Sequence, residues 1–137
     1  MLDFASLDTC KLAEAGVPMQ IRHPKTGTLV LRSDGEPTTI TLMGRGSQTY
    51  EDVQRRIQDR RVERQAQGIR LTPDDLKAED TDILIACTKD WNIEEMDGAP
   101  FPCTPQHIAK FWSDRRFPWL REVAINFITQ HANFLAT

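Results

Sequence analysis

Residues 1–46 carry the short alternating runs of apolar and polar residues that are typical of β-strands. Before them, Ser6 and Asp8 precede an apolar run that stops at Gly16, which predicts a short capped helix over residues 7–15. Strands are then expected at residues 17–21, 28–31 and 38–43, separated by turn-forming glycine, proline and aspartate residues. The first two strands should form a hairpin, and the third should complete a small antiparallel sheet of about three strands.

From residue 47 onward the apolar positions recur at helical spacing. Ser47 is a candidate N-cap for a helix that continues to Gln67 and is closed by Gly68. The apolar stripe of this helix is confined to its first half, and residues 59–67 are almost wholly polar. We therefore expect the second half of the helix to project into solvent or toward a partner.

A second long helix is predicted to begin after Thr72, which serves as its N-cap. Apolar residues at three- and four-residue steps continue as far as Trp91, so this helix should lay one face against the core along its whole length. Residues 92–105 are rich in proline and predict a loop. Thr104 then caps a short helix, and Pro118 opens the last one.

These patterns together predict an α+β fold, in which a small N-terminal antiparallel β-sheet is followed by a C-terminal helical bundle. We expect a single domain over 1–137, with a β-rich part at 1–46 and a helical part at 47–137. The chain has 137 residues, of which 39% are hydrophobic and 27% charged, and this size and composition suit one globular domain with its own core.

Nothing in the sequence predicts export or membrane insertion. The opening Met1-Leu2-Asp3-Phe4 has no basic segment followed by an apolar one, and no segment approaches the roughly 20 apolar residues that cross a bilayer. Three widely spaced cysteines, without a CxxC motif, suit a reducing compartment. A cytoplasmic protein without membrane contact is the expectation.

The sequence also lacks a recognisable catalytic or metal-binding motif. The turn Gly44-Arg45-Gly46-Ser47 lacks the further glycines and the lysine of a P-loop, and it is better read as a strand-to-helix turn with a serine cap. Cys103 and His107 have the spacing of half a zinc site, but no second half accompanies them. We therefore expect a protein that is not an enzyme and needs no cofactor or metal.

Charge is segregated along the chain. Residues 51–70 hold six arginines against four acids, whereas residues 74–97 hold nine acids against two lysines. On the first of these segments, Arg56, Arg60 and Arg64 recur at four-residue steps. This stripe either belongs to an exposed helix with local ion pairs, or docks on an acidic surface such as another subunit's residues 74–97. The second alternative predicts self-association through opposite charges.

Other features bear on what the arginine stripe would contact. The net charge of −3 argues against nucleic acid as the partner. Trp112 and Trp119 are candidate aromatic anchors for a protein partner, but each lies beside a helical apolar stripe, which favours a place in the core.

Several short segments resemble, in their order and separations, the tail assembly chaperones of long-tailed bacteriophages and related prophages. The segments are residues 4–9 (FASLDT), 16–19 (GVPM), 23–27 (HPKTG), 44–47 (GRGS), 88–91 (TKDW), 97–98 (DG), 117–122 (FPWLRE) and 132–135 (ANFL). Relatives carry an aspartate before the serine of the turn at 44–47, where this chain has Gly46. That departure concerns only the cap of the following helix.

The resemblance implies a non-enzymatic protein that acts in the host cytoplasm. It would bind the tape measure protein before the tail tube polymerises around it, and tail tube subunits would then displace it. Two alternatives stay open: a structural tail or head-tail connector component that remains in the virion, and a nucleic-acid-binding regulator that uses the arginine helix.

Overall fold

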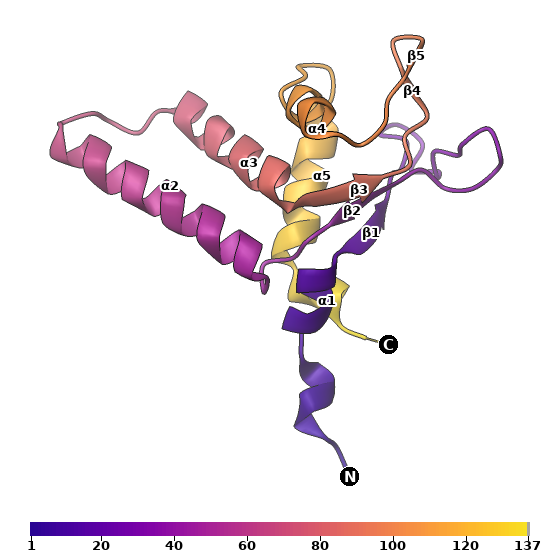
Figure 1. Cartoon of the computed structure of the whole chain (residues 1–137), viewed down its shortest axis with the longest axis horizontal. Helices are drawn as coiled ribbons and strands as arrows, with labels where there is room; N and C mark the ends of the chain where they lie inside the picture. The colour runs from indigo at the N-terminus through magenta and orange to yellow at the C-terminus, as the bar shows by residue number, and fades with distance from the viewer. Residues whose placement is uncertain (137) are drawn as a thin grey trace.

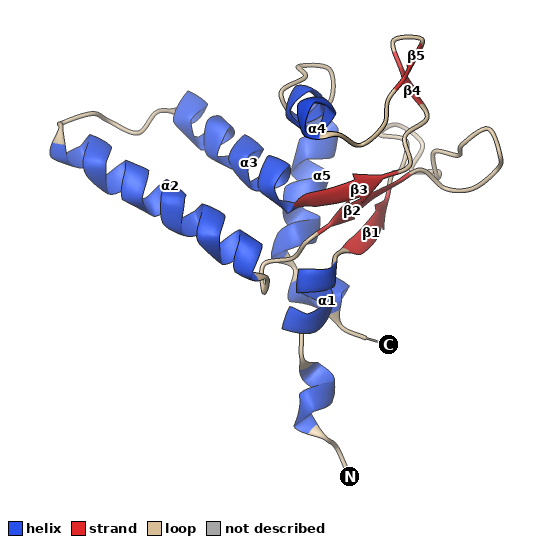
Figure 2. Cartoon of the chain, in the orientation of Figure 1, coloured by secondary structure: helices blue, strands red, loops and turns tan. Residues whose placement is uncertain are grey.

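A three-stranded antiparallel sheet lies at the centre of the computed structural model, which describes residues 1–136. Strand β1 (Val17–Gln20) pairs with β2 (Thr39–Leu42), and β2 pairs in turn with β3 (Thr88–Trp91). The β-branched and apolar residues of β2 alternate across the sheet, so that Ile40 and Leu42 are fully buried on the helix-covered side. The α+β class predicted from the sequence is confirmed (Figure 2).

The predicted strand over residues 28–31 does not form. This segment makes only isolated bridges, between Arg22 and Leu29 and between Leu31 and Pro37. The backbone N–H of Val30 donates to Ile21, but the turns on either side leave too few residues for a ladder of paired strands. The predicted first hairpin is therefore reduced to a single antiparallel bridge across its turn, and in the sheet β1 pairs with β2 instead.

The third strand comes instead from residues 88–91, where the sequence predicted the end of a long helix. Helix α3 (Pro73–Cys87) stops at Cys87, and the Thr88 hydroxyl donates to the carbonyl of Leu84 at 2.6 Å as the chain turns into β3. Thr88 and Trp91 are buried while the two residues between them are exposed. This three-residue spacing fits a helix as well as a bulged strand, which explains the error.

Four further α-helices and two 3-10 turns complete the described part of the chain. They are α1 (Cys10–Ala15), α2 (Gln48–Ala66), α4 (Pro105–Trp112) and α5 (Pro118–Thr129), with the 3-10 turns η1 (Phe4–Leu7) and η2 (His131–Phe134) near the ends of the chain. Helix α3 is central, because it contacts α2, α4 and α5. A small hairpin of β4 (Glu95–Met96) and β5 (Ala99–Pro100) lies in the loop before α4.

The helix caps predicted at residues 47, 72 and 104 are present, whereas the helix predicted over 7–15 begins only at Cys10, after Thr9, which makes no side-chain cap bond. The Ser47 hydroxyl accepts a hydrogen bond from the Tyr50 N–H, and Thr72 forms a reciprocal capping box with Asp75. Thr104 caps α4 in the same way through the N–H of His107. Each cap satisfies a backbone donor that the first turn of a helix leaves free, so helix starts were the best predicted boundaries.

Helices α2 and α3 form an antiparallel hairpin that extends away from the rest of the molecule (Figure 1). Near its base, Val53 and Ile57 of α2 join the main core together with Ile83 of α3. Toward its tip the hairpin has few apolar residues to bury, and the two helices are joined by charged side chains. Among residues 1–136, no helix has the length and apolar character needed to cross a membrane.

Candidate functional site

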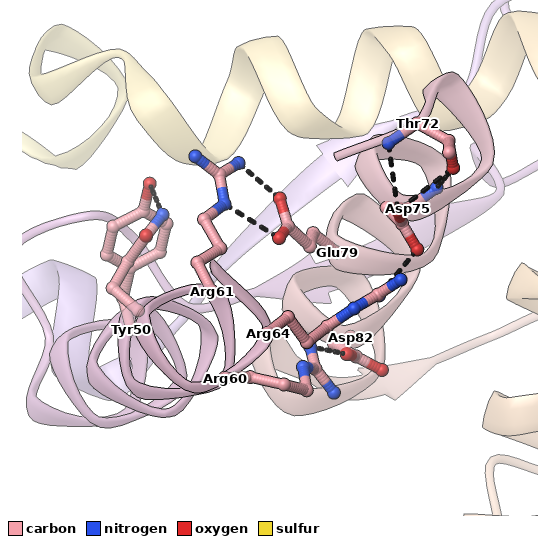
Figure 3. A network of polar contacts seen from close by, with 9 residues as sticks. Tyr50, Arg60, Arg61, Arg64, Thr72, Asp75, Glu79 and Asp82 are labelled. Atoms are coloured by element: carbon pink, nitrogen blue, oxygen red, sulfur yellow. Dashed lines mark hydrogen bonds and ion pairs between the residues drawn. The ribbon is translucent and has the colours of Figure 1, made fainter. Parts of the chain in front are cut away.

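The distal half of the α2–α3 hairpin is held together by ion pairs between the two helices (Figure 3). Arg60 pairs with Asp82, Arg61 with Glu79, and Arg64 with Asp75. The N–O distance is 2.7 Å both for Arg60 with Asp82 and for Arg64 with Asp75. The arginine helix therefore does not project freely into solvent, because its acidic counterpart is supplied by the same chain.

The pairing follows from the spacing of these residues on antiparallel helices. Asp75, Glu79 and Asp82 are separated by four and three residues, which places all three carboxylates on one face of α3. Their partners on α2 run in the opposite order, so the first arginine meets the last acid. The basic segment 51–70 and the acidic segment 74–97 therefore pair with each other within one molecule.

The pair of Arg61 and Glu79 is the most buried of the three. Glu79 is 8% exposed, and the guanidinium of Arg61 donates two hydrogen bonds to its carboxylate, one of them from Nε at 2.8 Å. These bonds lower the pKa of Glu79 against the opposing effect of burial. A carboxylate this poorly hydrated depends on its arginine to stay ionised.

The Asp75 carboxylate takes part in the N-terminal cap of α3 and also contacts α2. It accepts from the backbone N–H of Thr72 at 2.8 Å and from the Arg64 guanidinium at 2.7 Å. The Thr72 N–H and then Arg64 lower the pKa of Asp75 to about 2. One side chain therefore fixes both the start of α3 and its distance from α2.

A pocket of about 620 Å³ opens between the two helices beside these pairs, near the loop that joins them. Its lining combines the apolar Ile69, Leu71 and Ala78 with charged residues that include Arg64 and Arg70. Ile69 and Leu71 are 44% and 49% exposed, so the pocket presents aliphatic surface to solvent. An apolar floor with charged groups at the edge is the usual composition of a protein-binding pocket.

A smaller pocket of about 340 Å³ lies nearer the base of the hairpin. Arg56 and Arg60 border it from α2, and Ile85 borders it from α3. Arg60 touches both pockets, so the arginine stripe follows the groove between the helices. Within α2 itself, Arg55 lies 3.6 Å from Asp52, three residues earlier on the helix.

The two candidate tryptophan anchors differ in burial. Trp112 is fully buried, and its Nε1–H donates to the Thr88 hydroxyl at 2.8 Å. It is a core residue and is not available to a partner. Trp119 is half-buried at the edge of the core and far along the chain from the arginine stripe, so its role as an anchor stays a prediction.

Sequence reasoning identified Arg56, Arg60 and Arg64 but missed the residues that complete the site. Arg61 does not share the four-residue spacing of that stripe, although its partner Glu79 is the buried acid of the hairpin. Ile69 and Leu71 lie in the loop and have no helical periodicity to mark them. The one available signal was the pair of aliphatic residues within an otherwise polar connection.

Two other candidate sites from the sequence have structural explanations. Ser47 Oγ donates to the Gly44 carbonyl at 2.7 Å and accepts from the Tyr50 N–H, so this turn is the predicted serine cap. The His107 ring stacks on Phe101 with centroids 4.6 Å apart. Within the described part of the chain, no cluster of three or more histidine, cysteine or acidic side chains could hold a metal ion.

Comparison of the chain with protein-family models, with curated proteins and with solved structures found no match.

Proposed function

We propose that the protein is a phage tail assembly chaperone, not an enzyme, which binds the tape measure protein in the host cytoplasm and helps recruit tail tube subunits. The observation that carries this proposal is the exposed apolar pocket at the tip of the α2–α3 hairpin, with arginines along its rim. The sequence resemblance supplies the identity of the partner.

The dimensions of the pocket suit a few side chains of a partner helix. Its volume of about 620 Å³ is in the range of sites that enclose part of a ligand, and is too small for a whole helix. A helix lying along the groove would place apolar residues from one face against Ile69 and Leu71. A long helical protein offers such a face repeatedly, so several copies of the chaperone would coat it.

The ion pairs of the hairpin support binding that is reversible. Arg60 and Arg64 already have carboxylate partners on α3, so an acidic partner gains their charge only by competing with Asp82 and Asp75. Such a contact adds little net free energy and weakens with salt. Weak repeated contacts allow tail tube subunits to displace the chaperone.

The same ion pairs favour a protein partner over nucleic acid. A phosphate backbone binds through arginines whose charge is available, whereas four of the five arginines of this helix are paired with acids. A structural component of the tail is the remaining competitor, and it differs from a chaperone in staying with the finished particle.

The direct test is co-expression with the tape measure protein of the same genome. We expect the tape measure protein to become soluble and to co-purify with many copies of this chain. Ile69→Asp and Arg56→Glu should each reduce the number of bound copies, because they place charge in the pocket and reverse it along the groove. Leu31→Asp is the matched control, since Leu31 is 58% exposed and lies outside both pockets.

Two results would overturn the proposal. One is a tape measure protein that stays insoluble, with this chain recovered in purified virions, which would identify a structural tail component. The other is solubilisation that Ile69→Asp leaves unchanged, which would place the binding surface elsewhere.

A further inference from the structure

The N-terminal segment of the chain exposes several large apolar side chains without a partner. We define residues 1–8 as the N-terminal arm, and all eight are exposed. Leu2, Phe4 and Leu7 are 72%, 77% and 47% exposed. The 3-10 turn η1 within the arm is capped by Asp3 and has no buried residue. An ordered turn that displays apolar residues indicates a surface that another molecule covers.

The arm cannot cover the pocket of its own hairpin. It leaves the body beside α1, whereas the hairpin extends in a different direction and its tip lies far from the N-terminus (Figure 1). Points that are far apart in one projection are at least as far apart in space. The exposed arm and the exposed pocket of one molecule are therefore available to other molecules at the same time.

The two surfaces are complementary in charge. The pocket is lined by four arginines and two acids, namely Arg60, Arg61, Arg64 and Arg70 with Asp75 and Glu79. The arm carries Asp3 and Asp8 and no lysine or arginine, so its two carboxylates outnumber the single positive charge of the Met1 ammonium group. Three of the pocket's arginines are already paired with carboxylates of α3, so among the described residues Arg70 supplies the unbalanced positive charge of the pocket. An acidic, apolar segment thus matches a pocket with apolar lining and one unbalanced arginine.

We propose that the N-terminal arm of one copy of this protein inserts into the α2–α3 pocket of a second copy. Phe4 and Leu7 of the arm contact Ile69 and Leu71 of the pocket, and the arm's two carboxylates face the rim arginines, including Arg70. A segment of this length supplies two or three apolar side chains, which matches a pocket of about 620 Å³.

This contact is head-to-tail, because it joins two different surfaces: the N-terminal arm of one copy and the α2–α3 pocket of the next. Each bound copy still has one unused arm or pocket, so the contact builds rings or open chains instead of stopping at a symmetric dimer. A small contact with charged edges gives association that depends on concentration and weakens as salt is raised. The inference does not rest on the tape measure protein being the client.

Sedimentation velocity of the full chain over a wide range of concentration tests the proposal. The wild-type protein should form larger species as its concentration rises, and added salt should dissociate them. Phe4→Asp and Ile69→Asp should each leave the protein monomeric. Both side chains are substantially exposed, so neither change should unfold the protein, and circular dichroism would check this. Leu31→Asp is again the control and should associate like the wild type.

Mixing the two variants provides the decisive test. Phe4→Asp keeps an intact pocket, and Ile69→Asp keeps an intact arm, so an equimolar mixture should form a heterodimer that grows no further. A wild-type protein that stays monomeric, variants that still associate, or a mixture that stays monomeric would each overturn the inference.

This test also separates the inference from the function proposed above. Because Phe4→Asp leaves the pocket intact, it should still solubilise the tape measure protein while failing to self-associate. If self-association is lost in Phe4→Asp but no tape measure protein binds to any form, the arm contact stands and the chaperone proposal fails.

Discussion

The ring of Phe134 packs directly on the backbone of Gly44, so closely that a Cβ atom on Gly44 would lie 2.7 Å from the Cε2 atom of Phe134. Phe134 is 1% exposed and belongs to η2, near the end of the chain. The neighbouring Arg45 N–H donates to the Ile128 carbonyl at 2.9 Å, and the Gly44 N–H donates to Ala13 at 3.0 Å. Two segments that carried the sequence resemblance, 44–47 and 132–135, therefore meet in space.

Gly44→Ala should lower the free energy of unfolding by about 1–3 kcal/mol, which is the usual cost of overpacking a filled core. The added methyl group has to displace Phe134 or the strand-to-helix turn. Urea denaturation would measure the change. In the Phe134→Leu background the smaller side chain leaves room for the methyl group, so Gly44→Ala should cost less there. Equal costs in both backgrounds would contradict the steric explanation.

The buried ion pair predicts an asymmetry between single and double variants. Arg61→Met should destabilise the protein, because it leaves the Glu79 carboxylate buried without a partner. The double variant Arg61→Met with Glu79→Met should be more stable than Arg61→Met alone, since the unpaired charge is gone. Arg55→Met is the control for loss of an exposed arginine on the same helix. Thermal unfolding would rank the stabilities of these three variants and the wild-type protein.

Much of the fold could be predicted from the sequence, because local rules determine it. The caps at Ser47, Thr72 and Thr104 depend on residues within one turn, and all three were predicted. The errors lie where long-range pairing decides the outcome. Thr88 to Trp91 becomes a strand because the edge of β2 accepts it, and nothing within that segment reveals this edge.

The candidate site shows the same limit. Helical spacing placed Arg60 and Arg64 on one stripe, but it could not show that Asp82 and Asp75 of the same chain would face them. The choice between a partner within the chain and one on another subunit depends on how α2 and α3 pack. That packing is decided by the loop between them and by the apolar residues at the base of the hairpin.

The hairpin should loosen in acid. The folded-state pKa of Asp75 is about 2, below its ordinary value of 3.8, so the folded protein binds this proton less readily than the unfolded chain does. The stability that Asp75 contributes is complete above its unfolded pKa and is lost as the pH falls from about 4 to about 2. Asp75→Asn should therefore show less loss of stability across this range than the wild type.

Asp74→Asn is the matched control for this experiment, because Asp74 is the adjacent exposed acid in the first turn of α3. It should keep the wild-type dependence on pH. Urea midpoints measured at several pH values between about 5 and about 2 would compare the three proteins. An Asp75→Asn protein as sensitive to acid as the wild type would show that other carboxylates dominate the transition.

The three cysteines should react with a thiol reagent in a fixed order. Cys10 is exposed at the start of α1 and should be alkylated first. Cys103 is partly buried, and burial raises the pKa of its thiol, so it should follow more slowly. Cys87 is fully buried at the end of α3, and burial raises the pKa of its thiol to about 12, so it should react only when the protein unfolds.

Mass spectrometry of peptides after timed alkylation would give the order, and Cys10→Ser should remove the fast step alone. Modification of Cys87 as fast as that of Cys10 in native buffer would show that the junction of α3 and β3 opens locally, without global unfolding.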